Sequence, residues 1–398
     1  MKRRDFMRAA VPGALALLNA KLWAAGPGDA KLLVVMLRGA YDGASLLVPY
    51  SSEFYYRSRP GIAVPRPDSG GPDSGVALDA DWALNPVVKD SLHAMYAAKQ
   101  ALFIPFSGSE DLSRSHFQAQ DLMELGQGSG ALDYSSGYLN RLVEALAGGA
   151  PAGISFTNNL TPVFKGAIPV PNISLRGNMQ NNLPPRQSEL IAALYEGTAL
   201  SGMATAGIET RKMVSGELMT EMAESSRGAG PARAFESRAR AMAKLMRDRS
   251  AYSIGFADVG GWDTHVDQGS AQGALAANLA GLSSGLAVYA REMGALWKST
   301  VVVVMSEFGR TFRENGNRGT DHGHGNTLWV LGGGIAGGRI AGRQIAVSEA
   351  SLFQNRDFPV LNDYRSVLAD LFARMYGLGG EALGRVLPGA KAEDYGFI

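Results

Sequence analysis

The hydrophobic positions of this chain fall into short continuous runs, separated by longer stretches with helical spacing. The continuous runs are typical of strands buried on both faces of a sheet. They lie at Lys31–Leu37, Ala101–Phe106, Tyr252–Ala257, Val301–Met305 and Leu328–Leu331. Apolar residues also recur every three or four positions from Leu275 to Leu296, which predicts a long amphipathic helix. Strands that alternate with helices predict an α/β fold, with a mostly parallel central sheet covered by helices on both faces.

Further helices are expected around these strands. They are predicted from Asn85 to about Lys99, from just after Asp111 to Gly126, over most of Gln187–Arg249, and from Asp363 to Tyr376. The segment Ile154–Leu175 carries short β-like pieces, and we expect it to form a lateral insertion. There is no internal repeat and no clear domain boundary, so residues 30–398 are expected to form one domain.

The N-terminus has the pattern of an export signal. Arg3 and Arg4 form an arginine pair, Phe6 follows two residues later, and a mildly apolar stretch extends from Ala9 to Ala25. Pro12, Gly13, Asn19 and Lys21 interrupt this stretch, so it is too short and too broken for stable insertion into a membrane. Residues 1–25 therefore predict a twin-arginine signal peptide, the twin-arginine translocase as a partner, and a periplasmic or secreted location.

Composition narrows the chemistry. The chain has no cysteine, which excludes disulfides, thiolate metal sites and a cysteine nucleophile. Its formal net charge is +1 with no long run of one sign, so we expect no nucleic-acid partner. Fifty glycines suit a loop-rich α/β protein whose backbone turns tightly beside a site.

Polar residues gather where four of the predicted strands begin or end. They are Asp42 after the first strand, Asp263 and His265 after the Tyr252–Ala257 strand, Glu307 and Arg310 after the valine-rich strand, and His322 and His324 before the Leu328–Leu331 strand. In open α/β sheets the ligand site lies outside the carboxyl ends of the strands. Carboxylates and imidazoles at one sheet edge predict a site for one or two divalent metal ions, with zinc favoured and manganese, magnesium or calcium as alternatives.

The spacing of these residues supports chelation but leaves alternatives open. Asp263 and His265 are two residues apart, as are His322 and His324, and in an extended segment such pairs lie on one side. Alternatively, Asp42 caps a turn and Asp263 caps the long helix. Glu307 and Arg310 are also compatible with a plain ion pair beneath a loop.

A candidate nucleophile precedes the helix that is expected after Asp111. Ser115 and His116 lie near its start, where backbone N–H groups and the helix dipole favour an anion. Ser115 is a candidate to attack a phosphate or sulfate, with Arg114 or Arg310 holding the substrate oxygens. The alternative is that Ser113 or Ser115 is simply the N-cap. A Gly-x-Ser-x-Gly elbow is absent, which disfavours an α/β-hydrolase esterase.

Five motifs stand out together. They are Arg38-Gly39-Ala40-Tyr41-Asp42-Gly43, Ser115-His116-Phe117-Gln118-Ala119-Gln120-Asp121, Gly261-Trp262-Asp263-Thr264-His265, Ser306-Glu307-Phe308-Gly309-Arg310-Thr311 and Asp321-His322-Gly323-His324-Gly325-Asn326. In these motifs the chain resembles the exported bacterial domain-of-unknown-function 1501 family, which is placed in the alkaline phosphatase and sulfatase superfamily. The motifs are spread over nearly the whole chain that follows the signal. The resemblance implies an alkaline phosphatase-like fold with a two-metal, phosphatase-like site.

The resemblance also assigns roles to individual residues. Asp42 would match a first-strand metal ligand and Ser115 the nucleophile, while Asp263, His265 and His324 would hold one metal. Glu307 stands where the superfamily has an aspartate followed directly by histidine. Phe308 replaces that histidine, so a second ion would be held by His322 or His116, held differently, or missing.

Two functions follow as expectations. The first is a periplasmic metal-dependent hydrolase acting on a phosphate or sulfate ester, either a small molecule or a polymer. Its predicted catalytic residues are Ser115, His116 and Arg310, and its predicted metal residues are Asp42, Asp263, His265, Glu307, His322 and His324. The second is a non-catalytic exported binding or assembly protein that retains the fold.

Overall fold

The computed structural model describes residues 30–146, 152–175, 194, 198, 234–249 and 251–397. The predicted signal peptide and most of the helical stretch expected at Gln187–Arg249 lie outside these residues. The strands of the central sheet are β1 (Lys31–Leu37), β5 (Ala101–Gly108), β6 (Ala152–Ser155), β7 (Tyr252–Val259), β8 (Thr300–Ser306), β9 (Asn326–Gly332), β10 (Arg339–Ile340) and β11 (Asn362–Asp363). A small second sheet contains β2 (Leu47–Val48), β3 (Val76–Ala77) and β4 (Ala83–Leu84).

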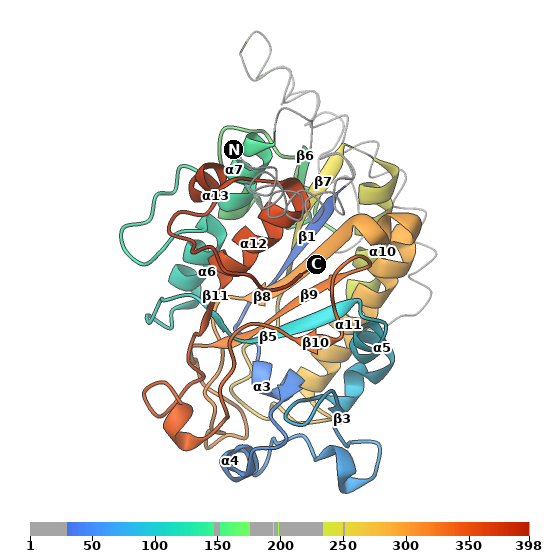
Figure 1. Ribbon diagram of the computed structural model, residues 1–398, viewed down its shortest axis with the longest axis vertical. Helices are drawn as coiled ribbons and strands as arrows, with labels where there is room; N and C mark the ends of the chain where they lie inside the picture. Colours follow the sequence, from blue (N-terminus) through green and yellow to red (C-terminus); the bar gives the residue numbers. More distant parts are fainter. Residues whose placement is uncertain are drawn as a thin grey trace, which may run out of the picture.

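The order of the eight-stranded sheet explains where its polar ends meet. The strands follow the order β10-β5-β9-β8-β1-β7-β6, and β11 also pairs with β5 (Figure 1). β1 is parallel to β7 and β8, and β6 is parallel to β7. β9 is antiparallel to both of its neighbours, β5 and β8. The residues just before β9 therefore lie at the same edge as those just after β1, β5, β7 and β8.

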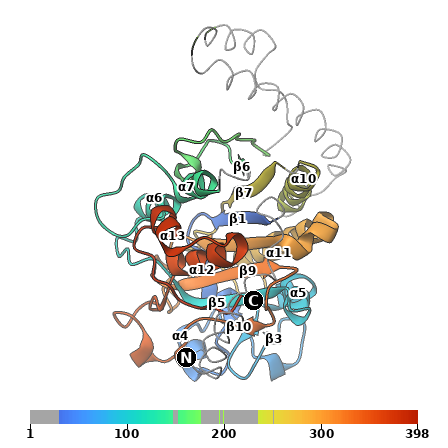
Figure 2. The ribbon, with the colours of Figure 1, turned by 45° about the horizontal axis from the view of Figure 1, so that its top comes forward.

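Helices cover both faces of this sheet (Figures 1 and 2). The helices are α3 (Gly43–Leu46), α4 (Glu53–Ser58), α5 (Ala94–Ala97), α6 (His116–Leu125), α7 (Tyr138–Ala145), α10 (Ala234–Asp248), α11 (Ala274–Met293), α12 (Tyr364–Tyr376) and α13 (Gly380–Val386). Short helical turns lie at Pro67–Ser69, Pro86–Val88, Lys89–His93, Pro162–Phe164, Gly294–Ser299 and Glu349–Ser351. Among the described residues, no helix is both long enough and apolar enough to cross a bilayer.

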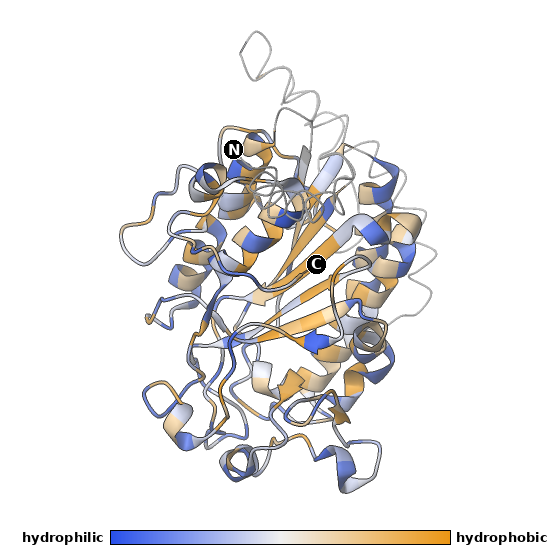
Figure 3. Ribbon diagram, viewed as in Figure 1, coloured by the Kyte–Doolittle hydropathy of each residue, from blue (hydrophilic) through white to orange (hydrophobic). Residues whose placement is uncertain are grey.

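Alternate side chains of each strand enter two separate hydrophobic layers, because successive residues of a strand point to opposite faces. In β1, Leu33 and Val35 pack with α10 and α11, whereas Leu32 and Val34 pack with α6, α7, α12 and α13. The hydropathy colouring shows the same concentration of apolar residues on the central strands (Figure 3). Burial on both faces accounts for the continuous apolar runs.

The predicted fold class is confirmed, and individual elements differ in detail. The helix expected from Asn85 to about Lys99 consists of two short turns followed by α5, and Lys99 has a left-handed φ of 59°. Only the first two residues of the segment Ile154–Leu175, where a lateral insertion was expected, belong to a strand of the main sheet. They end β6, the edge strand, which pairs in parallel with β7, and a helical turn at Pro162–Phe164 lies further along the segment.

Candidate metal centre

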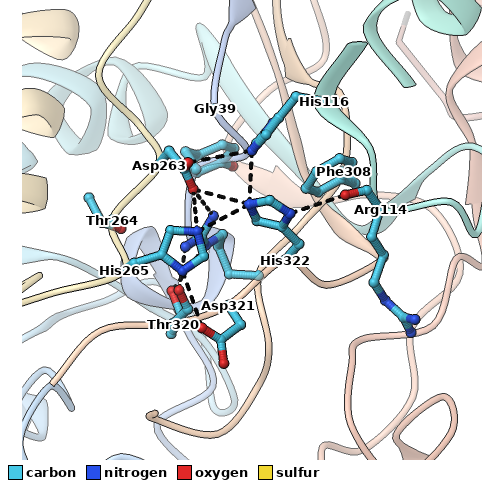
Figure 4. Close-up of polar contacts among 12 residues, drawn as sticks. Gly39, Arg114, His116, Asp263, Thr264, His265, Phe308, Thr320, Asp321 and His322 are labelled. Carbon is cyan, nitrogen blue, oxygen red and sulfur yellow. Dashed lines mark hydrogen bonds and ion pairs between the residues drawn. The ribbon is translucent and has the colours of Figure 1, made fainter. Parts of the chain in front are cut away.

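Four side chains from three distant segments converge at this edge of the sheet (Figure 4). They are His116 at the start of α6, Asp263 and His265 after β7, and His322 before β9. His322 Nε2 lies 2.9 Å from His116 Nε2 and 3.1 Å from His265 Nε2. Asp263 Oδ1 lies 2.9 Å from His265 Nε2 and 3.3 Å from His322 Nε2. This group, called the histidine cluster below, brings four candidate ligands together.

The outer nitrogen of each imidazole faces an acceptor oxygen. The three contacts are His116 Nδ1 to Glu307 Oε1 at 2.8 Å, His265 Nδ1 to Asp321 Oδ1 at 3.2 Å, and His322 Nδ1 to the Arg114 carbonyl oxygen at 3.1 Å. Metal-binding histidines characteristically donate their second ring N–H to a carboxylate or a backbone carbonyl. That contact fixes the tautomer and leaves the other nitrogen free to bind an ion.

The donor set therefore fits a divalent cation. If each Nδ1 carries the proton, the lone pair of His322 Nε2 faces those of His116 Nε2 and His265 Nε2 at hydrogen-bonding distance. A cation between them removes this repulsion. His116, Asp263 and His322 offer ligand atoms that all lie within 4.8 Å of one another, and they are the one such group in the part of the chain that the structure describes. Imidazole nitrogens and carboxylate oxygens are both ligand types that divalent metal ions accept.

Glu307 lies behind His116 and is fully buried. Its Oε1 accepts hydrogen bonds from Gly39 N at 2.8 Å and Gln120 Nε2 at 2.9 Å, and its Oε2 accepts one from Ser306 Oγ. Burial alone would raise the pKa of Glu307, but the hydrogen bonds from His116 and Gln120 hold this pKa below its usual value. Glu307 is thus an ionised carboxylate that orients His116. The structure does not place it among the inward-facing ligand atoms.

Arg310 forms an ion pair with Asp263. Its side chain has no solvent exposure, and its Nη1 lies 2.5 Å from Asp263 Oδ1. Its Nε and Nη2 donate to the hydroxyl and the carbonyl of Thr320. Burial would raise the pKa of Asp263, but the Arg310 guanidinium lowers it. Arg310 therefore keeps Asp263 ionised and in place, and this geometry leaves it no exposed face for the substrate oxygens assigned to it from sequence.

Asp42 does not join the histidine cluster. It is buried, and Arg59 binds it through both carboxylate oxygens, at 2.5 and 3.1 Å. Ser45 Oγ and Gln268 Nε2 also donate to Asp42 Oδ2, each at 2.7 Å. Burial favours the neutral acid, but the charge of Arg59 lowers the pKa of Asp42. Its oxygens are engaged in a buried ion pair, contrary to the ligand role expected from sequence.

His324 also lies apart from the cluster. Its buried ring packs against Phe353, with ring centroids 5.0 Å apart, and burial lowers its pKa. The chain bends at His324, so His322 and His324 do not form the extended pair that their spacing suggested. This bend separates the two imidazoles.

Ser115 directly precedes His116 of the histidine cluster in the sequence. Ser115 is the N-cap residue of α6, although its side chain makes no capping hydrogen bond. The Arg114 carbonyl orients His322, while the Arg114 guanidinium points away from the histidines and pairs with Asp357 (Figure 4). Phe308 stacks on His116 with ring centroids 4.9 Å apart and forms an apolar wall where a histidine was expected.

Gly39 allows β1 and the ligand loop to approach closely. Its φ is 114°, and a Cβ there would lie 2.7 Å from the backbone nitrogen of Asp263. The same glycine donates its N–H to Glu307. A side chain at this position would displace the Asp263 backbone.

Several supporting residues were not assigned a role from sequence. Gln120 lies four residues after His116, and helical periodicity would have placed both on one face. Asp321 directly precedes His322, but nothing in that adjacency indicates that it contacts His265. Arg59 and Gln268 carry no motif, so their contacts with Asp42 emerge only from the folded chain.

Comparisons with solved structures returned matches of low identity. A protein in the alkaline phosphatase superfamily from Vibrio parahaemolyticus is 11% identical, with 92% of this chain and 71% of that chain covered and a TM-score of 0.41. The lipoteichoic acid synthase LtaP from Listeria monocytogenes is 7% identical, with coverages of 88% and 73% and a TM-score of 0.36. The alkaline phosphatase from the Antarctic bacterium TAB5 is 12% identical, with coverages of 76% and 91% and a TM-score of 0.30.

Sequence comparison gives the family. No curated protein sequence matched this chain. The model of one family, described as "Protein of unknown function (DUF1501)", matches residues 29–388, which include every member of the histidine cluster. Because this match spans most of the chain, the protein belongs to the DUF1501 family.

Proposed function

We propose that this protein is a metal-dependent hydrolase of phosphate or sulfate esters, with the histidine cluster as its metal site. The observation that carries the proposal is the convergence of three imidazole Nε2 atoms on the Asp263 carboxylate, with every outer ring nitrogen anchored. Since His116, Asp263 and His322 form the one group of ligand atoms within 4.8 Å of one another in the described residues, we propose one ion, with zinc as the favoured metal.

The ligand side chains of the site are accessible to a substrate, and the residues that support them are buried. The side chains of Asp263 and His265 are 44% and 40% exposed, whereas Glu307 and Arg310 behind them have none. A bound divalent ion would polarise an ester oxygen as a Lewis acid. His116, His265, His322 and Asp263 would hold it, and Glu307 and Asp321 would orient two of the imidazoles.

Ser115 is the proposed nucleophile. It occupies the N-cap of the ten-residue helix α6 and is bonded directly to His116. Backbone N–H groups and the helix dipole at such an end favour a phosphate or sulfate group, and they lower the cost of an alkoxide. This placement supports an oxyanion substrate, either a small molecule or a polymer.

Export belongs to the same proposal. Arg3, Arg4 and Phe6, followed by a weakly apolar stretch, support twin-arginine translocation of the folded protein to the periplasm. Replacing both arginines with lysines is expected to leave the protein in the cytoplasmic fraction. Periplasmic recovery of that variant would contradict this route.

The enzymatic part is tested with protein purified without chelator. Aryl phosphates and aryl sulfates are offered with zinc or manganese, before and after metal removal. We expect turnover that depends on metal and is lost in His322→Ala and in Ser115→Ala. His93→Ala removes a histidine outside the cluster and is expected to retain activity. Metal binding without turnover in the parent protein would contradict the hydrolase and favour a non-catalytic exported binding protein.

A further inference from the structure

Gln268 is a fully buried side-chain amide in the loop between β7 and α11. Its Oε1 accepts hydrogen bonds from Thr264 Oγ1 at 2.8 Å and from Thr320 Oγ1 at 2.9 Å. Its Nε2 donates to Asp42 Oδ2 at 2.7 Å and also contacts Ser45 Oγ at 3.2 Å. Every polar atom of the amide is therefore engaged with another buried side chain.

The two threonines belong to the two loops that carry most of the cluster. Thr264 lies between Asp263 and His265, and Thr320 lies two residues before His322. Thr320 also accepts a hydrogen bond from Arg310 Nε, and Arg310 in turn binds Asp263. One amide oxygen thus joins the two ligand loops.

The amide nitrogen of Gln268 donates to a buried carboxylate that is itself held in an ion pair. Asp42 is held by the buried Arg59 guanidinium, which also donates to the carbonyl oxygens of Thr311 and Phe312. Asp42, expected from sequence to be a metal ligand, is instead paired with Arg59 and anchors the amide that joins the ligand loops.

We infer that Gln268 is a positioning residue that sets the geometry of the metal centre by locking the Asp263–His265 loop to the Thr320–His322 loop. This inference rests on the proposed function only in requiring that the cluster binds a divalent ion. Ligand atoms must be held close to their final positions if a site is to bind tightly, because residual motion is lost on binding. Gln268 makes no contact with the ligand atoms themselves, so its effect passes through the two threonine hydroxyls.

The test uses Gln268→Met, which keeps the approximate length and volume of the side chain but removes both hydrogen-bonding functions. Zinc affinity is measured by competition with a chromogenic chelator, and the visible spectrum of the cobalt-loaded protein reports coordination geometry. We expect the zinc affinity to fall about 10- to 100-fold, the range typical of lost supporting contacts, and the cobalt spectrum to change. Urea unfolding of the metal-free protein measures stability separately.

Asn140→Leu is the matched control. Asn140 is also a fully buried amide, and it bonds to the backbone of Phe164 and Ile168, with no contact to either ligand loop. The Asn140→Leu substitution is expected to destabilise the metal-free protein and to leave the zinc affinity unchanged. An equal loss of affinity in this control would show a general effect of destabilisation and overturn the inference.

A second pair of variants decides the matter if Gln268→Met does not fold. Thr264→Val removes the hydrogen bond from Thr264 to Gln268 Oε1, whereas Thr264→Ser retains the hydroxyl that donates it. We expect weaker zinc binding in the valine variant and recovery in the serine variant. Unchanged affinity in both Gln268→Met and Thr264→Val, with a zinc-binding parent, would overturn the inference and leave the proposed function intact. A parent protein that binds no divalent ion would overturn both.

Discussion

At the scale of single residues, the centre depends on which nitrogen of each histidine faces inward. Glu307, Asp321 and the Arg114 carbonyl each engage an Nδ1 atom, and the Nε2 atoms of His116 and His265 both face His322 Nε2. Glu307 is the buried member of this set and carries its charge among neutral donors and His116. Its hydrogen bond to His116, together with its negative charge, raises the pKa of His116 and makes that imidazole a better ligand for a cation.

Glu307→Gln is therefore expected to weaken zinc binding about 10-fold or more, because the amide retains the shape but loses the charge behind His116. Chelator competition measures the change. Asp370→Asn is the control, since it removes another poorly exposed carboxylate, paired with Arg374 on α12. Equal zinc affinities in the parent protein and in Glu307→Gln would show that this carboxylate does not support the site.

Asp42→Asn tests the buried ion pair. It leaves the guanidinium of Arg59 buried without its charged partner, which is expected to cost about 3–5 kcal/mol of unfolding free energy. Glu53→Gln removes the partner of Arg66 in an exposed ion pair, in which the Arg66 and Glu53 side chains are 32% and 79% exposed. It should cost about 0–1 kcal/mol of unfolding free energy. Urea unfolding at neutral pH compares both variants with the parent. Similar costs in the two variants would contradict the role given to Asp42.

The same pair has a defined pH dependence. The pKa of Asp42 is lower in the folded chain than its unfolded value of about 3.9. The carboxylate therefore contributes stability above about pH 4, and this contribution disappears as pH falls through the folded-state pKa. The stability difference between the parent and Asp42→Asn should shrink below about pH 4. A difference that grows in acid would contradict this sign.

Residue spacing predicted part of the site. Asp263, His265 and His322 come together as expected, and His116, predicted as a catalytic residue, supplies the fourth candidate ligand. Asp42 could not be placed from sequence because its partner Arg59 is defined only by the fold. His324 was misplaced because the two-residue rule holds for extended backbone, and the chain bends there.

At the scale of elements, the polar ends meet because of strand direction. Hydrophobic runs located the central strands, but a run that is buried on both faces gives no information on direction. The segment that carries His322 precedes β9, and it reaches the common edge because β9 runs antiparallel to β8. A parallel β9 would have carried this histidine to the opposite edge.

The start of α6 was predicted less accurately than its end. The helix was expected from just after Asp111, but it begins at His116. Phe117, the second residue of this helix, is 86% exposed. The end at Gly126 is confirmed, since this glycine adopts φ 65°, a conformation that most other residues avoid.

Gly126 and Gly377 form a matched pair of helix ends. Both are left-handed C-cap residues, with φ of 65° and 68°. A Cβ at Gly126 would lie 2.6 Å from Tyr138 Cβ, whereas one at Gly377 would meet nothing within 4 Å. Gly377→Ala should cost about 1–2 kcal/mol from backbone strain alone, and Gly126→Ala about 1–3 kcal/mol more from overpacking. Urea unfolding measures both; equal costs would contradict the contact with Tyr138.

At the scale of the whole molecule, the centre joins segments that are far apart in sequence. His116, Asp263 and His322 follow or precede different strands of the central sheet. An ion bound here crosslinks these segments in the folded chain and has no comparable site in the unfolded chain. Metal binding should therefore stabilise the entire fold.

The stabilisation is measurable by thermal unfolding. Zinc at 100 times its Kd should add about 2.7 kcal/mol to the unfolding free energy, and a chelator should remove this increment. His322→Ala should show no zinc-dependent shift in Tm. His324→Ala should retain the shift, because this buried histidine lies outside the cluster. If His324→Ala lost the zinc-dependent shift in Tm and His322→Ala kept it, the assignment of ligands would be contradicted.

The most direct test is a crystal structure of zinc-loaded protein with anomalous diffraction data collected on both sides of the zinc edge. We predict a peak bounded by His116 Nε2, His265 Nε2, His322 Nε2 and an Asp263 carboxylate oxygen, at about 2.0–2.2 Å from its ligands. A zinc peak held instead by Asp42 and His324, or an absence of any peak between the three imidazoles, would contradict the account.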